Sequence, residues 1–248
     1  MTKENFMPVE VVLTVVATSI IQSLFGAGVL LFGTPILLLL GHSFIDVLVV
    51  LLPISIAINL LQIVKHHAHI DFSFYRRVIF LAVPPIIVFL FLITHTRINI
   101  GLVIGAFLLF IALKEFSPGV VSTIDTLMKY EKTYFVTMGI VHGLSNLGGS
   151  LLTALVHHKN YEKDVARVTI AASYGTFAVA QLLTLWIFSR SQIEIPYAEN
   201  GIYLVVGALV FLLTDEMLYT QIDQTKYRRI FAGFLALAGM VLILRALG

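Results

Sequence analysis

Long apolar stretches alternate with short polar segments along almost the whole chain. Charge-poor segments lie approximately at 9–40, 44–64, 78–94, 98–113, 134–156, 168–188, 201–214 and 230–247. A helix needs about 20 apolar residues to cross a bilayer, and most of these segments are close to that length. The polar segments between them are too short to form a separate soluble domain. The pattern predicts an all-α polytopic membrane protein with eight hydrophobic segments.

Composition supports this prediction and excludes other classes of protein. Hydrophobic residues make up 58% of the 248 residues and charged residues only 12%, which is more apolar surface than a soluble core can bury. The chain contains no cysteine, so disulfide bonds and thiolate metal sites are excluded. The formal net charge of +2 is too small to indicate nucleic-acid binding. The first apolar run is too long for a signal-peptide core, and we expect it to be uncleaved.

Two of the apolar segments are interrupted by similar groups of small and polar residues. Residues 22–31 read Gln-Ser-Leu-Phe-Gly-Ala-Gly-Val-Leu-Leu, and residues 142–152, 120 positions later, read His-Gly-Leu-Ser-Asn-Leu-Gly-Gly-Ser-Leu-Leu. Paired interruptions in the two halves of a membrane chain are typical of a transporter's substrate site. We therefore predict two related four-segment halves, with a first membrane repeat at 1–116, a linker at 117–132 and a second repeat at 133–248.

The basic residues bear on how these segments cross the membrane. If all eight segments cross, Lys and Arg divide 9 to 7 between the two faces. If the first segment of each half instead enters and returns as a re-entrant hairpin, the division becomes 12 to 4, which agrees better with the positive-inside rule. Hairpins would make the two halves antiparallel, whereas eight full crossings, which stay open, would make them parallel. In the hairpin arrangement the four basic residues on the poorer face are Lys3, Arg97, Arg190 and Arg245.

The interruptions supply the candidate substrate-binding residues. Glycines let the chain turn sharply and let an anion approach backbone N–H groups, and the helices that begin near Val29 and Ser150 would point their positive ends at the same place. Polar residues in facing apolar segments could complete the pocket, with Gln62 and Gln181 at similar places in the two halves. Close helix packing through small residues is the alternative interpretation. The predicted site comprises Gln22, Gly26, Gly28, Asn59, Gln62, His142, Ser145, Asn146, Gly148, Gly149, Ser150 and Gln181.

Histidine and arginine residues need separate consideration. The histidines at 66–69 and 157–158 lie at predicted span ends and lack the spacing and carboxylates of a metal or di-iron centre. We therefore expect no enzymatic activity, no metal and no cofactor. His142 lies beside an interruption and is a candidate protonatable group near substrate. Arg167 could attract an anion, although headgroup anchoring is the interpretation that its position at a span end favours.

The interruption motifs also resemble those of the sulfite exporter TauE/SafE family. The resemblance is carried by residues 24–35, with Gly41 closing the segment, and by residues 144–152. The usual three glycines are reduced to Gly-Ala-Gly and Gly-Gly-Ser here, and Pro35 has no counterpart near Leu155. The resemblance implies a multi-pass inner-membrane secondary transporter of a small anion such as sulfite, an organosulfonate or a carboxylate. Its other partners would be the lipid bilayer and a coupling proton or sodium ion, and homo-oligomers stay open. An anion channel and a structural subunit of a membrane complex are the alternatives.

Overall fold

Helices make up nearly all of the structure. The computed structural model describes residues 8–26, 28–96, 98–114, 117–190, 193, 196–218 and 224–248, and none of these residues lies in a β-strand. The predicted all-α class is therefore confirmed for the described part of the chain. Four helical stretches there are long and apolar enough to cross a membrane, namely Phe44–Lys65, Phe72–His95, Lys163–Phe188 and Tyr197–Asp215.

The helices follow the predicted apolar segments. In chain order they are α1 (Val9–Phe25), α2 (Val29–Leu39), α3 (Phe44–His66), the 3₁₀ turn η1 (His67–His69), α4 (Phe72–Arg77), the π-helical turn η2 (Val78–Ala82), α5 (Val83–His95), α6 (Ile100–Lys114), α7 (Pro118–Lys129), α8 (Glu131–Ser145), α9 (Gly149–His158), α10 (Lys163–Phe188), α11 (Tyr197–Leu218) and α12 (Gln224–Leu247). The amphipathic α7 occupies most of the predicted linker and buries Ile124 and Met128.

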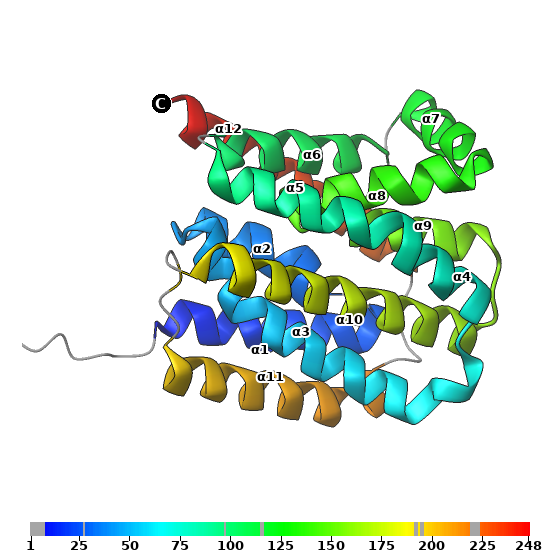
Figure 1. Ribbon diagram of the computed structural model, residues 1–248, viewed down its shortest axis with the longest axis horizontal. Helices are drawn as coiled ribbons and strands as arrows, with labels where there is room; N and C mark the ends of the chain where they lie inside the picture. The colour runs from blue at the N-terminus through cyan, green and yellow to red at the C-terminus, as the bar shows by residue number, and fades with distance from the viewer. Residues whose placement is uncertain are drawn as a thin grey trace, which may run out of the picture.

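Two of the apolar segments each form a pair of short helices that reverses direction inside the protein. Helices α1 and α2 both have their outer ends at the left of Figure 1, and the chain turns between them in the interior. Helices α8 and α9 have their outer ends at the right, so this second hairpin enters from the opposite end of the molecule. At 11 and 10 residues, α2 and α9 are each only about 16 Å long or less, about half of a hydrocarbon core.

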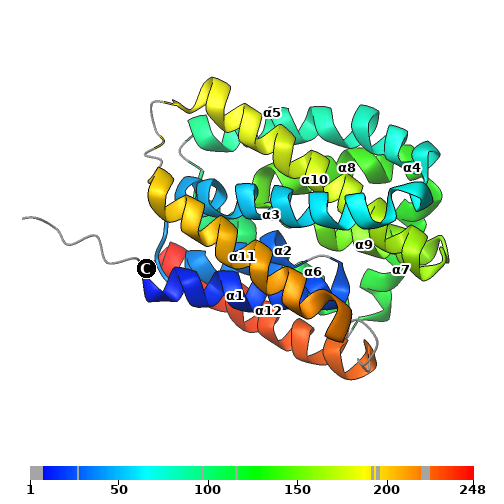
Figure 2. The ribbon, with the colours of Figure 1, turned by 90° about the horizontal axis from the view of Figure 1, so that it is seen from below.

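Helices from different parts of the chain pack together in a regular pattern. Helix α3 packs along α10, α1 along α11, α5 along α8, and α6 along α12 (Figure 2). Helices α6 and α12 approach closely at Gly105 and Gly239, where a Cβ atom on either residue would lie 2.8 Å from the carbonyl oxygen of the other. Each of these four contacts joins a helix before α7 to a helix after it, so the two halves of the chain interleave.

The right-hand end of the molecule in Figure 1, where α3 and α9 end and α4 and α10 begin, carries most of the basic residues on described helix ends. We call it the basic end. The basic residues there include Lys65, Arg76, Arg77, Lys159 and Lys163. Arg190 and Arg245 lie at the opposite end, where α10 and α12 finish. This distribution matches the hairpin arrangement of the sequence analysis for these residues.

Polar contacts join the loops and helix ends at the basic end. Glu131 accepts from Arg77 and lies 2.8 Å from Lys159 Nζ, which connects α4, α8 and the turn after α9. The Tyr161 hydroxyl donates to the Asp71 carboxylate. Burial alone would raise the pKa of Asp71, but this bond, the amides of Phe74 and Ser73 and the nearby charge of Arg77 together lower it. Burial and the same bond raise the pKa of Tyr161.

Candidate functional site

The first interruption is a tight reversal that one glutamine side chain stabilises. Helix α1 ends at Gly26, which has a left-handed φ of 73° and donates its amide to the Gln22 carbonyl over 2.8 Å. Gly28 then packs directly on α1, since a Cβ atom there would lie 2.5 Å from the Gln22 backbone nitrogen. The Gln22 Oε1 atom accepts from the amides of Gly28 and Val29, each over 2.9 Å. These bonds satisfy two of the N–H groups that the start of α2 leaves without an intrahelical partner.

The second interruption repeats this construction 120 residues later. Helix α8 ends at Asn146, which has a left-handed φ of 62° and donates its amide to the His142 carbonyl over 2.8 Å. Gly148 packs on α8 because a Cβ atom there would lie 2.5 Å from the His142 Cβ. Asn146 therefore takes the place of Gly26, His142 that of Gln22 and Gly148 that of Gly28. Asparagine tolerates the left-handed conformation better than most residues, so the substitution is physically reasonable.

Each interruption also contacts one long helix through a pair of polar side chains. Gln22 Nε2 donates to Asn59 Oδ1 on α3 over 3.1 Å, and Asn59 in turn donates to the Ser55 carbonyl. His142 Nε2 lies 3.1 Å from Gln181 Oε1 on α10. Asn59, rather than Gln62, thus makes the hydrogen bond that corresponds to the bond of Gln181 in the second half. Both side-chain polar atoms of the buried Gln62 lack a hydrogen-bond partner among the described residues.

Polar atoms without a protein partner gather at the second interruption. His142 Nδ1, Asn146 Oδ1, Tyr174 Oη and Gln181 Nε2 are buried and make no hydrogen bond within the described part of the chain. Tyr174 lies directly over Gly149, where a Cβ atom would overlap its hydroxyl, and its ring centre is 6.0 Å from that of His142. Buried polar groups in native proteins are nearly always satisfied by protein, water or ligand. This cluster, which we call the polar cluster, is therefore the best candidate for a small polar ligand.

The polar cluster offers both donors and acceptors. Gln181 Oε1 can only accept, so His142 Nε2 is the donor of their bond and Nδ1 of a neutral ring is an acceptor. Asn146 Oδ1 is a second acceptor, whereas Tyr174 Oη and Gln181 Nε2 can donate. A ligand that satisfies all four atoms must carry acceptor oxygens together with hydrogen atoms of its own.

A side-chain hydrogen bond joins the two hairpins. Asn146 Nδ2 donates to Thr34 Oγ1 over 2.8 Å, and Thr34 lies in the middle of α2. Both residues are fully buried. The second interruption therefore meets the returning helix of the first hairpin, so the two motifs belong to one region of the protein.

Arg167 is buried in the protein, whereas its sequence position favoured a place among the lipid headgroups. Its side chain is only 7% exposed and forms an ion pair with Asp215, which is 6% exposed on α11. Lys65 Nζ lies 3.6 Å from the same carboxylate. A Cβ atom on Gly26 would lie 3.6 Å from Arg167 Cγ, so the arginine stem borders the first interruption. Headgroup anchoring is therefore wrong for Arg167, because its guanidinium is buried against a carboxylate.

The hydroxyl groups of two predicted site residues donate to nearby backbone carbonyls and not to the polar cluster. Ser145 donates to the Val141 carbonyl over 2.7 Å, and Ser150 donates to the Leu147 carbonyl over 2.9 Å. Sequence reasoning missed Thr34, Tyr174 and Asp215. A signal for Tyr174 was present, because it lies two helical turns before Gln181 and therefore on the same face of α10.

Comparison with known proteins gives one match. The family model described as Sulfite exporter TauE/SafE matches residues 11–242, which include both interruptions and all helices from α1 to most of α12. No curated protein and no solved structure matches the chain significantly.

Proposed function

Because the chain belongs to the sulfite exporter TauE/SafE family, we propose that it is a secondary transporter of a small sulfur-containing or carboxylate anion in a bacterial inner membrane. The family name and the apolar helices both agree with a membrane transporter. The polar cluster of His142, Asn146, Tyr174 and Gln181 is the observation that carries the proposal, because it leaves four buried polar atoms available to a ligand.

The chemistry of the polar cluster favours an anion that arrives with a proton. Tyr174 and Gln181 provide donors for oxyanion oxygens, while the acceptors at His142 Nδ1 and Asn146 Oδ1 require hydrogen atoms. Hydrogen sulfite carries one hydrogen atom, which would satisfy one of these two acceptors. A fully ionised sulfonate would instead be accompanied by a proton on His142, which would turn the ring into a second donor and a counter-charge. Either binding mode brings a proton into the site together with the anion, which favours proton-coupled transport.

The helix packing supports two antiparallel halves. The two hairpins enter from opposite ends of the molecule. The contact of α1 with α11 corresponds to the contact of α8 with α5 when the two halves are interchanged. A twofold axis in the membrane plane would produce both features. In such inverted repeats substrate sites lie near the midplane where broken helices meet, and one group of helices rocks against the other. The bond between Asn146 and Thr34 lies where the two hairpins would move relative to each other.

Uptake by proteoliposomes tests the proposal. We expect purified protein to concentrate at least one labelled anion from a panel of sulfite, taurine, sulfoacetate and acetate when an inward proton gradient is imposed, and a sodium gradient of equal size to have no effect. Tyr174→Phe should lower uptake about tenfold, because it removes one buried donor. Tyr203→Phe, which alters a buried tyrosine on α11, is the matched control and should retain uptake.

Three results would overturn parts of the proposal. Equal uptake by the Tyr174→Phe and Tyr203→Phe variants would show that the polar cluster is not part of the transport site. Conductance without concentrative uptake would identify an anion channel. Absence of binding and flux for the whole panel would leave a structural role in a membrane complex.

A further inference from the structure

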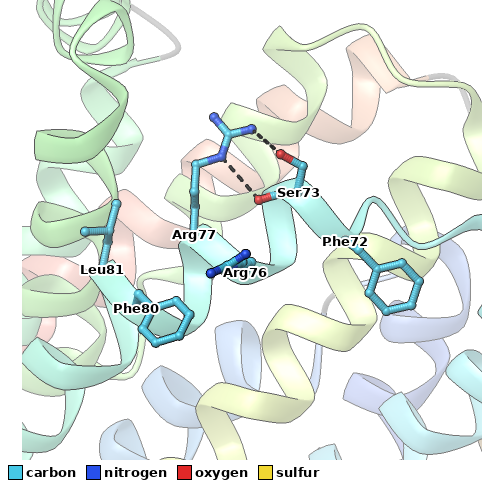
Figure 3. A pocket seen from close by; sticks show the side chains of 6 residues that line it. All are labelled: Phe72, Ser73, Arg76, Arg77, Phe80 and Leu81. Atoms are coloured by element: carbon cyan, nitrogen blue, oxygen red, sulfur yellow. Dashed lines mark hydrogen bonds between the residues drawn. The ribbon is translucent and has the colours of Figure 1, made fainter.

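A surface pocket lies far along the chain from both interruptions, at the junction of α4 and η2. Its volume is about 570 Å³, and its lining residues are Phe72, Ser73, Arg76, Arg77, Phe80 and Leu81. Figure 3 shows Arg76 beside Phe80 on one side of the helix, with Arg77 directed to the other side toward Ser73. None of these residues belongs to the candidate transport site, so the pocket needs a separate explanation.

The helix is widened where the pocket turns apolar. Residues Val78–Ala82 form a π-helical turn, and Pro84 and Pro85 follow at once. Proline lacks an amide proton and its ring clashes with the carbonyl four residues earlier, so it disturbs α-helical bonding in the preceding turn. Phe80 lies in this widened turn and is 65% exposed. A phenylalanine so exposed in an apolar span faces the lipid.

The two arginines of the pocket differ in whether a carboxylate neutralises their charge. Arg77 donates to the Ser73 carbonyl and hydroxyl, each over 3.3 Å, and forms an ion pair with Glu131. Arg76 is exposed and makes no ion pair with any residue the structure describes; its guanidinium lies 5.8 Å from the centre of the Phe80 ring. Arg76 therefore offers an uncompensated cation at the pocket, while the charge of Arg77 is met by a carboxylate.

The pocket changes from polar to apolar along the direction of the span. Ser73, Arg76 and Arg77 lie on α4, which is at the basic end, and Phe80 and Leu81 lie in η2, further into the apolar stretch Phe72–His95. Phe72, 68% exposed at the start of that stretch, has the position of an interfacial aromatic. A phospholipid has the same order, with its phosphate at the membrane surface and its acyl chains below.

We propose that this pocket binds an anionic phospholipid, with the headgroup phosphate on Arg76 and an acyl chain along Phe80 and Leu81. Arginine and lysine residues beside a membrane span attract anionic lipid headgroups. An isolated small anion would use the guanidinium but would leave the apolar half of the pocket without a function. The proposal is independent of the transport function, because the pocket shares no residue with either interruption.

Lipid binding by the full-length protein in detergent provides the test, with native mass spectrometry as the readout. We expect phosphatidylglycerol to bind in preference to phosphatidylcholine of the same acyl chains. Arg76→Gln should weaken phosphatidylglycerol binding about fivefold, which corresponds to the loss of one cation near an anionic headgroup. Phe80→Ala should weaken it as well. The matched control is Arg190→Gln, because Arg190 is also exposed and lies 5.6 Å from the Trp186 ring, but at the opposite end and outside the pocket.

Distinct results overturn the proposal. Equal phosphatidylglycerol affinities for Arg76→Gln and Arg190→Gln would show that the pocket does not select the lipid. Displacement of phosphatidylglycerol by millimolar inorganic phosphate, with Phe80→Ala unchanged, would assign the site to a small soluble anion. Because all variants leave the interruptions intact, transport by proteoliposomes of phosphatidylcholine alone would report separately on the transport function.

Discussion

Asn146 and Thr34 are joined by a buried side-chain hydrogen bond of 2.8 Å, although 112 residues separate them in the chain. The bond connects the turn of the second hairpin to the middle of the returning helix of the first. Asn146 also holds the left-handed position that ends α8. One residue therefore fixes the backbone of its own hairpin and the contact between the two hairpins.

These two roles of Asn146 can be separated by substitution. Asn146→Gly keeps the left-handed backbone but removes the side chain, and Thr34→Val removes only the hydroxyl. We expect both to lower anion uptake about fivefold while the protein still folds, since one buried hydrogen bond contributes about 1 kcal/mol. Asn160→Gly is the control, because Asn160 also has a left-handed φ, of 52°, in an exposed turn. Uptake unchanged in Asn146→Gly would mean that only the backbone of this position matters.

The glycines that pack against their own hairpins should be intolerant of a methyl group. Gly28→Ala and Gly148→Ala would each place a Cβ atom 2.5 Å from the nearest atom of Gln22 or His142. Such overpacking costs about 1–3 kcal/mol, so we expect a lower thermal unfolding temperature in detergent for both. Gly233→Ala in α12 is the comparison, because a Cβ atom there has no neighbour within 4 Å in the described part of the chain. A similar unfolding temperature for all three variants would contradict the tight reversal.

The stability of the basic end should depend on pH through Asp71 and Tyr161. The pKa of Asp71 is lowered from 3.8, so its contribution is present above that value and is lost as the pH falls through the lower folded-state pKa. The pKa of Tyr161 is raised from 10.0, so its contribution is present below pH 10.0 and is lost as the pH rises further. Tyr161→Phe should therefore lower the unfolding temperature most between these limits. Tyr130→Phe, which alters an exposed tyrosine, should show no such window.

Replacing only one residue of the buried ion pair between Arg167 and Asp215 should lower the stability of the protein strongly. Asp215→Asn leaves a buried guanidinium without its carboxylate, and loss of one partner of a buried pair typically costs about 3–5 kcal/mol. The double variant Arg167→Met with Asp215→Leu removes both charges and should recover most of the stability measured by thermal unfolding. If the single and double variants were equally unstable, the side chains would contribute through packing rather than through their charges.

Labelling of single cysteines would test the hairpins in the membrane. His42 follows α2 and His158 ends α9, at opposite ends of the molecule. His42 is preferable to Gly41, whose φ of 97° would strain a cysteine. In this cysteine-free chain we expect a membrane-impermeant reagent to label His42→Cys and His158→Cys from opposite faces. Labelling of both from one face would indicate eight full crossings.

The sequence predicted the interruptions because glycine and polar residues stand out within apolar segments. The capping of α2 by Gln22 and the contact of His142 with Gln181 involve residues that the same reasoning had selected. Thr34 escaped notice because a threonine in an apolar helix normally bonds to its own backbone. The burial of Arg167 could not be predicted either, since its partner lies 48 residues away on α11 and only tertiary packing brings them together.

The two hairpins differ in how fully protein groups satisfy the polar side chain at equivalent positions, Gln22 in the first and His142 in the second. The Gln22 side-chain oxygen accepts from the amides of Gly28 and Val29, and its nitrogen donates to Asn59. Protein groups therefore satisfy the polar atoms of this side chain and hold the first turn in place. His142 makes one side-chain bond at the same position, and its Nδ1 atom has no hydrogen-bond partner among the residues that the structure describes. Under the proposed function the first hairpin is the fixed one and the second receives the substrate, so substitutions that confer new substrate preferences should accumulate around His142 rather than around Gln22.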